Sequence, residues 1–418
     1  MLKQIEGSKA VAEAIALCRP EVVCAYPITP QTHIVEGVGE LVKSGELKNC
    51  EFINVESEFA ALSVAIGASA AGGRAYTATA SQGLLFMAEA VYNAAGLGLP
   101  IVMTVGNRAI GAPINIWNDH SDSVSVRDSG WIQLYAETNQ EALDLHIQAF
   151  RLAEELSCPV MVCMDGFILT HAYERVEMPT QDEVDAFLPP FEPVQVLDPA
   201  DPYSIGAMVG PDAFTEVRYL AHEKQLRALR LIPEISDVFK EVFGRETGGL
   251  LHTYRTEGAE TLVVGLGSVN GTIKETVDKM REDGAAIGAV SICSFRPFPL
   301  DELRAVLEPA KRVVVIEKCF AVGLGGIVAA DVQMAMRGSP VPVYTVIAGL
   351  GGRPITMSVL QEVFEAAAED RLPDVQFLDL DHAAVEHELI RSIATRRSGP
   401  TAENILRAMG RGEIAVNE

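Results

Sequence analysis

The chain has 418 residues, of which 48% are hydrophobic and 22% charged, values typical of two or three globular domains rather than of a disordered or fibrous protein. Its 57 acidic residues outnumber the 33 basic ones, giving a formal charge of −24. Such a charge repels phosphate backbones and anionic lipid surfaces, which argues against nucleic acid and membrane partners.

The cysteines and the N-terminus indicate a cellular compartment. The seven cysteines are scattered, and their spacing matches no disulfide framework, zinc knuckle or iron–sulfur motif, so we predict no metal site in this chain. The first seven residues lack the basic start of a secretory signal. The longest uncharged run, residues 90–107, contains Asn, Gly and Pro residues that disfavour a membrane helix. We therefore expect a cytoplasmic protein.

Helical and strand-like patterns alternate over the first 170 residues. We predict helices over residues 9–17, 32–44, 57–71, 84–95 and 140–156, and strands from residue 22 and over 52–55, 75–80, 100–105 and 159–163. This alternation predicts an α/β fold whose mostly parallel sheet is covered by helices on both faces.

The pattern breaks between about residues 177 and 249, where Pro-rich and acidic pieces indicate an excursion and linker with a helix only near 236–243. Regular alternation then resumes, with strands over residues 262–264, 286–292, 313–317 and 341–347 and helices near 272–282, 300–307 and 326–336. We predict a first domain over 1–250, a second α/β domain over 251–385 and a basic C-terminal helix or tail over 386–418. The arginines of this tail suit either a solvated helix face or a docking arm for a partner subunit: Arg391, Arg396, Arg397, Arg407 and Arg411.

The segment Tyr26-Pro27-Ile28-Thr29-Pro30 follows the first predicted strand, at the edge where open parallel sheets bind ligands. Its two prolines restrict the backbone, so the Thr29 hydroxyl is held at little entropic cost. The alternative is a rigid turn whose hydroxyl caps the next helix.

Glu56-Ser57-Glu58 precedes an uncharged, Ala-rich helix. One glutamate is explained as a capping group stabilised by the helix N-terminus. The second faces apolar residues, and a buried acid able to protonate a ring nitrogen is useful in catalysis, which makes Glu58 a candidate.

Arg108 follows the strand over residues 100–105 and is the only strongly basic residue between Arg74 and Arg127. An arginine at the carboxyl end of a parallel strand can clamp a carboxylate with two hydrogen bonds. The alternative is an ion pair with Asp119, Asp122 or Glu56.

Three other motifs are weaker. Asp119-His120-Ser121-Asp122 is explained by hydrogen bonding within a loop better than by a metal, because no second ligand cluster accompanies it. The glycine-rich turn over residues 265–271 departs from the dinucleotide fingerprint. The glycine-rich residues 349–353 fit a tight loop between domains.

Together these motifs resemble, in order and spacing, the α subunit of multi-subunit 2-oxoacid:ferredoxin oxidoreductases, the pyruvate synthase group. Over residues 5–175 the resemblance is carried by the segment from Tyr26 to Pro30, Glu56-Ser57-Glu58, Thr79-Ala80-Ser81-Gln82-Gly83, Asn107-Arg108-Ala109 and Asp119-His120-Ser121-Asp122. Phe295-Arg296-Pro297-Phe298-Pro299 and residues 349–353 resemble the C-terminal half of that subunit. The resemblance implies a thiamine-diphosphate-binding domain of the pyrimidine type followed by a transketolase C-terminal-like domain.

The resemblance also implies roles for individual residues. Glu58 would hydrogen-bond the pyrimidine ring nitrogen and activate thiamine diphosphate, while Pro27 and Ile28 would line the cofactor pocket. Arg108 and the Thr29 hydroxyl would bind the carboxylate of the 2-oxo acid. The implied reaction is oxidative decarboxylation of a 2-oxo acid, pyruvate being favoured, to acyl-CoA and CO2, with electrons passed to iron–sulfur clusters.

Other parts of such an enzyme are missing from the sequence. The Gly-Asp-Gly and Asn pattern that holds Mg2+ and diphosphate has no counterpart, and no cysteines are spaced as cluster ligands. The resemblance therefore implies a β subunit that supplies the Mg2+ and diphosphate site, γ and ferredoxin-like δ subunits that complete the complex, and ferredoxin or a similar acceptor. Ser8-Lys9 departs from the acidic or amide pair more usual in the family, without touching a proposed catalytic role.

Three alternatives stay open. One is half of a non-oxidative thiamine-dependent decarboxylase or transferase. Another is the same oxidative reaction on an aromatic or branched 2-oxo acid, with NAD or ferredoxin as acceptor. The third is a scaffold subunit whose site is inactive, which the presence of Thr29, Glu58 and Arg108 argues against.

Overall fold

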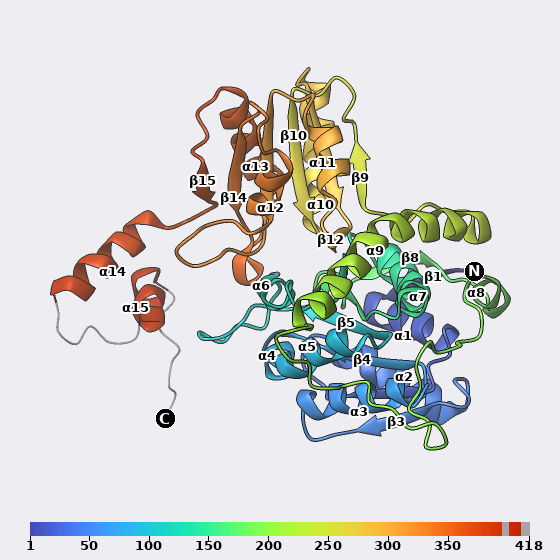
Figure 1. Cartoon of the computed structure of the whole chain (residues 1–418). Coiled ribbons are helices and arrows are strands. Elements are labelled where there is room, and N and C mark those ends of the chain that lie inside the picture. The colour runs from blue at the N-terminus through green and yellow to red at the C-terminus, as the bar shows by residue number, and fades with distance from the viewer. Residues whose placement is uncertain (395–400, 411–418) are drawn as a thin grey trace. The chain divides into compact units, whose positions relative to one another are not determined.

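Two sheets built mostly of parallel strands organise the larger part of the chain (Figure 1). The structure is a computed structural model, and it describes residues 1–394 and 401–410. The chain divides into two units, Met1–Gln376 and Phe377–Glu418. Both sheets carry helices between their strands, so the predicted α/β class is confirmed.

The first sheet has seven strands in the order β12-β6-β7-β5-β4-β2-β3, and only the β12–β6 pair is antiparallel. Strands β4, β5 and β7 are buried along their whole length, which explains their continuous apolar sequences. The bounds are β2 (Val22–Ala25), β3 (Glu51–Asn54), β4 (Ala75–Thr79), β5 (Ile101–Asn107), β6 (Ile132–Tyr135), β7 (Val160–Asp165) and β12 (Ser294–Arg296). A separate antiparallel ribbon pairs β1 (Leu2–Glu6) with β8 (Tyr173–Glu177).

The five helices predicted in this region are present, one of them divided, whereas the short helices α6 and α8 were not predicted. The helix predicted over residues 84–95 is two helices, α4 and α5, which meet at Met87. The bounds are α1 (Gly7–Leu17), α2 (Thr32–Ser44), α3 (Glu58–Ala70), α4 (Ser81–Phe86), α5 (Ala88–Leu97), α6 (Ser121–Ser125), α7 (Asn139–Leu156) and α8 (Gln181–Phe187).

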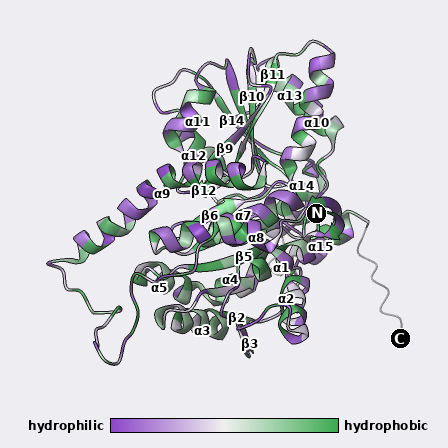
Figure 2. Ribbon diagram, turned by 90° about the vertical axis from the view of Figure 1, so that its right-hand side faces the viewer, coloured by the Kyte–Doolittle hydropathy of each residue, from purple (hydrophilic) through white to green (hydrophobic). Residues whose placement is uncertain are grey.

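The predicted linker contains a long helix, which corrects the sequence interpretation. Helix α9 (Phe214–Phe243) runs for 30 residues and includes Pro233, the residue at which a helix is expected to break. Its buried face is formed by Ala228, Ile232, Ile235 and Phe239, whose spacing of three and four residues matches a helix. Burial of this face stabilises the helix on both sides of Pro233. Figure 2 shows hydrophobic and hydrophilic residues alternating along the helix.

The second sheet has six strands in the order β15-β14-β13-β10-β11-β9, and β9 pairs antiparallel with β11. Its strands are β9 (Leu251–Tyr254), β10 (Thr261–Leu266), β11 (Ile287–Ile292), β13 (Arg312–Glu317), β14 (Val343–Ile347) and β15 (Val375–Phe377). Its helices are α10 (Val269–Glu282), α11 (Leu300–Leu307), α12 (Val328–Ala335), the short 3-10 helix η1 (Leu350–Gly352) and α13 (Met357–Ala368).

A shared hydrophobic core joins the two sheets. One cluster of buried residues packs around Val91, Met103 and Trp131 of the first region and continues through Phe295 to Leu262 and Val313 of the second sheet. Strand β12 strengthens this link, because it follows β11 in the chain but pairs with β6 of the first sheet. The two sheets of Met1–Gln376 are therefore parts of one folded unit.

The unit Phe377–Glu418 contains α14 (His382–Ala394) and α15 (Thr401–Ala408). Arg391 pairs with Glu388 within α14, and Arg407 pairs with Glu403 within α15. Two of the five arginines predicted to form a basic surface are thus engaged with acids of their own helix. The other three, Arg396, Arg397 and Arg411, lie outside the described residues. None of the described helices combines the length and the apolar composition needed to cross a bilayer.

Candidate active site

The carboxyl edge of the first sheet gathers the residues that the sequence singled out. Thr29 follows β2, Glu58 follows β3, Gly83 follows β4 and Arg108 follows β5. These strands are neighbours and run parallel, so their carboxyl ends open on the same edge. Open α/β sheets bind their ligands at such an edge.

Glu58 is the first residue of α3 and is 8% exposed. Ser57 caps the helix, because its hydroxyl accepts a hydrogen bond of 3.2 Å from the Ala60 amide. The helix N-terminus stabilises the carboxylate electrostatically. Among residues 1–394 and 401–410, however, no group donates a hydrogen bond to it. Glu58 is thus a buried acceptor that is open to a ligand.

Gly83 makes room for this carboxylate. A Cβ at Gly83 would lie 2.7 Å from Oε1 of Glu58 and 2.6 Å from Oγ1 of Thr79. Only a residue without a side chain therefore fits in the first turn of α4 against Glu58. The sequence predicted no role for Gly83 beyond its place in the family motif, because the contact joins two helices and leaves no local pattern.

Two further buried polar atoms at this edge of the sheet have no partner in the described part of the chain. They are Oγ1 of Thr79 and Oε1 of Gln31. The amide nitrogen of Gln31 donates to the carbonyls of Tyr26 and Ala78, which fixes the side chain. Burying a polar atom without a partner costs about 1–3 kcal/mol, so these atoms fit a polar ligand that satisfies them. A ring carrying both N–H groups and acceptor nitrogens, as an aminopyrimidine does, matches this set.

Arg108 is buried, and backbone carbonyls are its partners. Its Nη1 donates to the carbonyl of Thr29 at 2.9 Å, and its Nε donates to the carbonyl of Asn115 at 3.1 Å. Burial lowers the pKa of Arg108, although the negative charge of Asp122 opposes this. Within the described residues no carboxylate forms an ion pair with the guanidinium, so the alternative of an ion pair with Asp119, Asp122 or Glu56 is wrong. The positive charge is held in place and left for an anion.

Asp122 fixes the ends of two neighbouring strands. It accepts backbone hydrogen bonds from Ser81, Arg108 and Ser123, and one from the Asn107 amide, at 2.7–3.0 Å. Burial raises its pKa to about 6, although these four donors act in the opposite direction. The sequence analysis placed Asp122 in a hydrogen-bonded loop or in an ion pair with Arg108. The contacts agree with the loop, because Asp122 bonds the backbone amide of Arg108 and not its guanidinium. Its positioning of Arg108 was not predicted.

Thr29, Pro27 and Ile28 lie in the segment between β2 and α2. Thr29 and Pro27 are exposed and Ile28 is half-buried, so the segment is open to a ligand or a partner chain. The structure brings Thr29 and Arg108 together through the Thr29 carbonyl. Contact of the Thr29 hydroxyl with a substrate, and of Pro27 and Ile28 with a cofactor, stay predictions.

A buried ion network holds the second domain against this edge. Asp165 at the end of β7 accepts from Nζ of Lys318 at 2.9 Å, from the Ser268 amide at 3.0 Å and from Nε2 of His120 at 2.7 Å. Burial would raise the pKa of Asp165, but Lys318 and His120 hold it well below its usual range. Ser268 belongs to the glycine-rich turn over residues 265–271, which here contacts the neighbouring domain.

The glycine-rich loop over residues 349–353 also lies between the domains. The Gly351 amide donates to Asp119 at 3.2 Å, and its carbonyl accepts from the Asn115 side chain at 3.1 Å. Gly351 has a φ of +60°, a conformation that glycine adopts without strain. The prediction of a tight loop between domains is confirmed.

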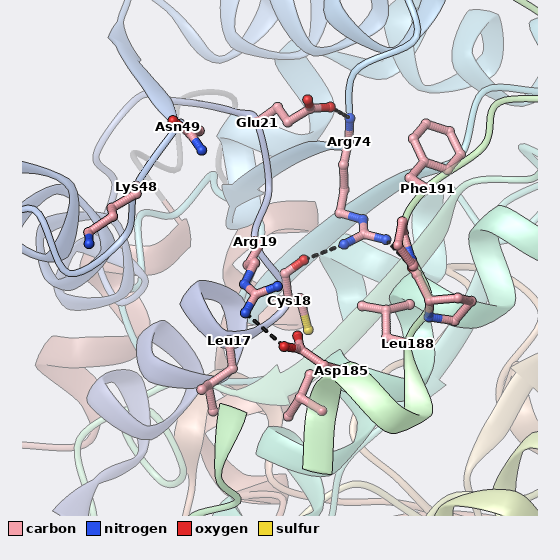
Figure 3. A pocket seen from close by; sticks show the side chains of 13 residues that line it. Leu17, Cys18, Arg19, Glu21, Lys48, Asn49, Arg74, Asp185, Leu188 and Phe191 are labelled. Carbon is pink, nitrogen blue, oxygen red and sulfur yellow. Dashed lines mark hydrogen bonds and ion pairs between the residues drawn. The ribbon is translucent and has the colours of Figure 1, made fainter. Parts of the chain in front are cut away.

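A cavity of about 470 Å³ lies at the opposite edge of the first sheet (Figure 3). Arg19, Lys48 and Arg74 line it, and each precedes a strand, which places the cavity at the amino ends. Arg19 is paired with Asp185 and Arg74 with Glu154, so two of the three cations are already neutralised. The cavity is thus separate from the edge that carries Glu58 and Arg108.

Comparisons with known proteins identify the family of the chain. The family described as pyruvate flavodoxin/ferredoxin oxidoreductase, thiamine diphosphate-binding, matches residues 13–236, and pyruvate:ferredoxin oxidoreductase core domain II matches residues 259–360. Pyruvate synthase subunit PorA of Methanosarcina barkeri is 47% identical over 385 residues, which cover 90% of this chain and 96% of that protein. Ketoisovalerate oxidoreductase subunit VorA of Pyrococcus horikoshii is 40% identical over 366 residues, covering 87% of this chain and 93% of that protein.

A solved structure shares the fold. It is the 2-oxoglutarate:ferredoxin oxidoreductase from Magnetococcus marinus with 2-oxoglutarate, coenzyme A and succinyl-CoA bound, with a TM-score of 0.65 and 20% sequence identity. The match covers 89% of this chain and 65% of that one, so the chain spans just under two thirds of the length of that relative.

Proposed function

The chain belongs to the α subunits of the 2-oxoacid:ferredoxin oxidoreductases, and we propose that it contributes the pyrimidine-binding half of a thiamine diphosphate site that oxidises pyruvate. The observation that carries this proposal is the buried, unpaired carboxylate of Glu58, which lies against Gly83 at the carboxyl edge of the first sheet. The names of the PorA relatives support pyruvate over other 2-oxo acids.

Thiamine diphosphate, when bound, supplies a nucleophilic carbon and accepts the electron pair released as the carboxylate leaves as CO2. Glu58 would bind the pyrimidine ring, and the unpaired atoms of Thr79 and Gln31 would complete the polar contacts. Pro27 and Ile28 would line the same pocket.

Glu58 has a proton-holding role in this proposal. Its carboxyl group would share a proton with a ring nitrogen, and this contact favours the ring tautomer that acts as an internal base. The helix N-terminus and the closeness of Gly83 keep the carboxyl group in one position, so little reorganisation accompanies the proton shift.

Arg108 would bind the carboxylate of the 2-oxo acid. Its fixed guanidinium presents a charge that no acid of the described chain neutralises, and the Thr29 hydroxyl stands on the segment that Arg108 holds. Two hydrogen bonds to one carboxylate would orient the keto carbon for attack.

The remaining parts would come from other subunits. A β subunit would hold Mg2+ and the diphosphate, and γ and δ subunits would complete the path of coenzyme A and electrons to ferredoxin. The exposure of Thr29 and Pro27 supports a partner chain that covers this edge. We expect the complex to work in the cytoplasm.

The test replaces Glu58→Gln in the complex purified under anaerobic conditions through a tag on this chain. Reduction of a viologen dye is measured with coenzyme A and a panel of 2-oxo acids. Wild type should turn over pyruvate fastest, and the variant should lose turnover while it keeps its cofactor, clusters and subunits. Near-normal rates in the variant would disprove the role of Glu58.

The choice of substrates tests the alternatives. The VorA relative supports a branched 2-oxo acid as the second candidate, so 3-methyl-2-oxobutanoate belongs in the panel. Release of CO2 without dye reduction would instead identify a non-oxidative enzyme.

A further inference from the structure

A cluster of three potential metal ligands lies at the junction of the two domains, away from the site described above. Glu141, His252 and Cys293 place a carboxylate oxygen, an imidazole nitrogen and the sulfur within 4.8 Å of one another. Tetrahedral zinc sites hold such atoms about 3.3–3.7 Å apart, so small side-chain rotations are enough to bring them around one ion. No spacing rule predicts this set, because the three residues are far apart in the sequence.

Three elements of regular secondary structure hold the cluster. Glu141 lies in the first turn of α7, His252 in β9 and Cys293 directly after β11. His252 is paired with Ser291 in the β9–β11 register, which brings it next to the end of β11. The Cys293 carbonyl accepts from the Tyr135 amide at 2.8 Å, which anchors it to the first sheet.

The cluster is buried but has one opening. Cys293 is 1% exposed, whereas the side chain of His252 is 28% exposed and provides a path from solvent. Nε2 of His252 lies 2.9 Å from Oε1 of Glu141. Burial raises the pKa of Cys293, and the charges of Glu141 and Glu137 raise it further, so the thiol is protonated without a cation.

A second acid, Glu137, lies between β6 and α7. One oxygen of Glu137 binds Lys274, and the other, Oε1, is buried without a hydrogen-bond partner among the residues described. The negative charge of Glu137 raises the pKa of both His252 and Cys293. Both oxygens of Glu141 already accept hydrogen bonds, one from His252 and one from the Glu137 amide. A cation at the cluster would replace the contact with His252 and leave the contact with the amide in place.

We propose that Cys293, His252 and Glu141 bind a zinc-type transition metal ion that links the two domains. The thiolate and imidazole select a borderline-soft ion such as Zn2+ over Mg2+ or Ca2+, which prefer oxygen. A water molecule, which can enter along the exposed side of His252, fills the fourth position. On binding, Cys293 releases its thiol proton to solvent. His252 gives up the Nε2 proton that it donates to Glu141, either to solvent or to its own Nδ1, and the freed nitrogen binds the metal.

The test loads the intact complex with Zn2+, removes unbound metal, and measures zinc per chain and the zinc-edge X-ray absorption spectrum. Iron–sulfur clusters do not interfere with this edge. Wild type should retain one zinc with one sulfur and two or three N/O neighbours. Cys293→Ser and His252→Gln should lower zinc affinity at least tenfold. Cys50→Ser, which changes a half-buried thiol in the first domain, is the matched control and should bind as wild type.

Thermal unfolding separates metal loss from misfolding. Without zinc, wild type and Cys293→Ser should melt at similar temperatures, and zinc should raise the melting temperature of wild type alone. A second cluster, Glu6, His33 and His171, contains no sulfur. Zinc bound there would therefore show no sulfur neighbour in the absorption spectrum. Equal zinc in wild type and Cys293→Ser, zinc without a sulfur neighbour, or no retained zinc would each overturn the proposal.

Discussion

Replacing Gly83 by alanine changes the position of Glu58 without changing its chemistry. The new Cβ would lie 2.7 Å from both Cγ and Oε1 of Glu58 and 2.6 Å from Oγ1 of Thr79. An ordinary contact begins at 3.4 Å, so the carboxyl group must move by roughly 0.7 Å or the start of α4 must shift by as much. The Glu58 side chain is largely buried, with 8% of it exposed, so it can move away from Gly83 only toward the space left for the ligand.

The displacement predicts the size of two effects, one on kcat and one on the free energy of unfolding. A misplacement of about 1 Å costs roughly 100-fold in rate when a positioning contact is involved, so kcat should fall by about one to two orders of magnitude. Overpacking of this kind also costs about 1–3 kcal/mol of unfolding free energy. The effect on activity should therefore exceed what the loss of stability explains, because most of the protein stays folded.

The assay is dye reduction by the anaerobic complex at saturating 2-oxo acid, with thiamine diphosphate varied. Gly83→Ala should lower kcat and weaken cofactor affinity together. Gly67→Ala is the matched control, since it lies in the same helix as Glu58, is exposed and has nothing within 4 Å of an added Cβ. It should raise stability by about 0.5–1 kcal/mol and leave kcat unchanged. Wild-type kcat in Gly83→Ala would refute the argument that Gly83 positions Glu58.

Other contacts give three further predictions. Arg108→Met removes a charged partner of the substrate carboxylate, and kcat/KM for the 2-oxo acid should fall about 10- to 100-fold in steady-state assays, whereas an unchanged value would exclude the clamp. Lys318→Met removes the lysine charge from buried Asp165, which keeps its hydrogen bonds from His120 and the Ser268 amide. This loss should cost about 3–5 kcal/mol in denaturant unfolding, and a loss below about 1 kcal/mol would contradict the network. Burial lowers the pKa of His146 to about 4, so the unfolded chain alone takes up a proton as the pH falls from about 6.5 to about 4. Unfolding free energy should therefore decrease over this range by about 3 kcal/mol in wild type, and His146→Gln should lose that slope in urea titrations at several pH values.

Local sequence patterns determined most of the elements. The apolar runs of β4, β5 and β7 and the capped start of α3 are properties of short segments, so strand and helix positions agree with the structure to within a few residues. The same local logic placed Thr29, Glu58 and Arg108 directly after strands. The prediction of a linker was wrong where burial overrides a local signal. In α9 the buried apolar face stabilises a helix that continues past Pro233.

Contacts between distant segments were decided by the tertiary structure. Three such contacts depend on which strands are neighbours: Gly83 with Glu58, Asp122 with the Arg108 amide, and Cys293 with His252. Buried parallel strands share nearly the same apolar composition, so their sequences carry little information about their order in a sheet. The sequence by itself therefore determined the elements and the chemical groups at their ends, and only the packing of the two sheets decided which of those groups meet.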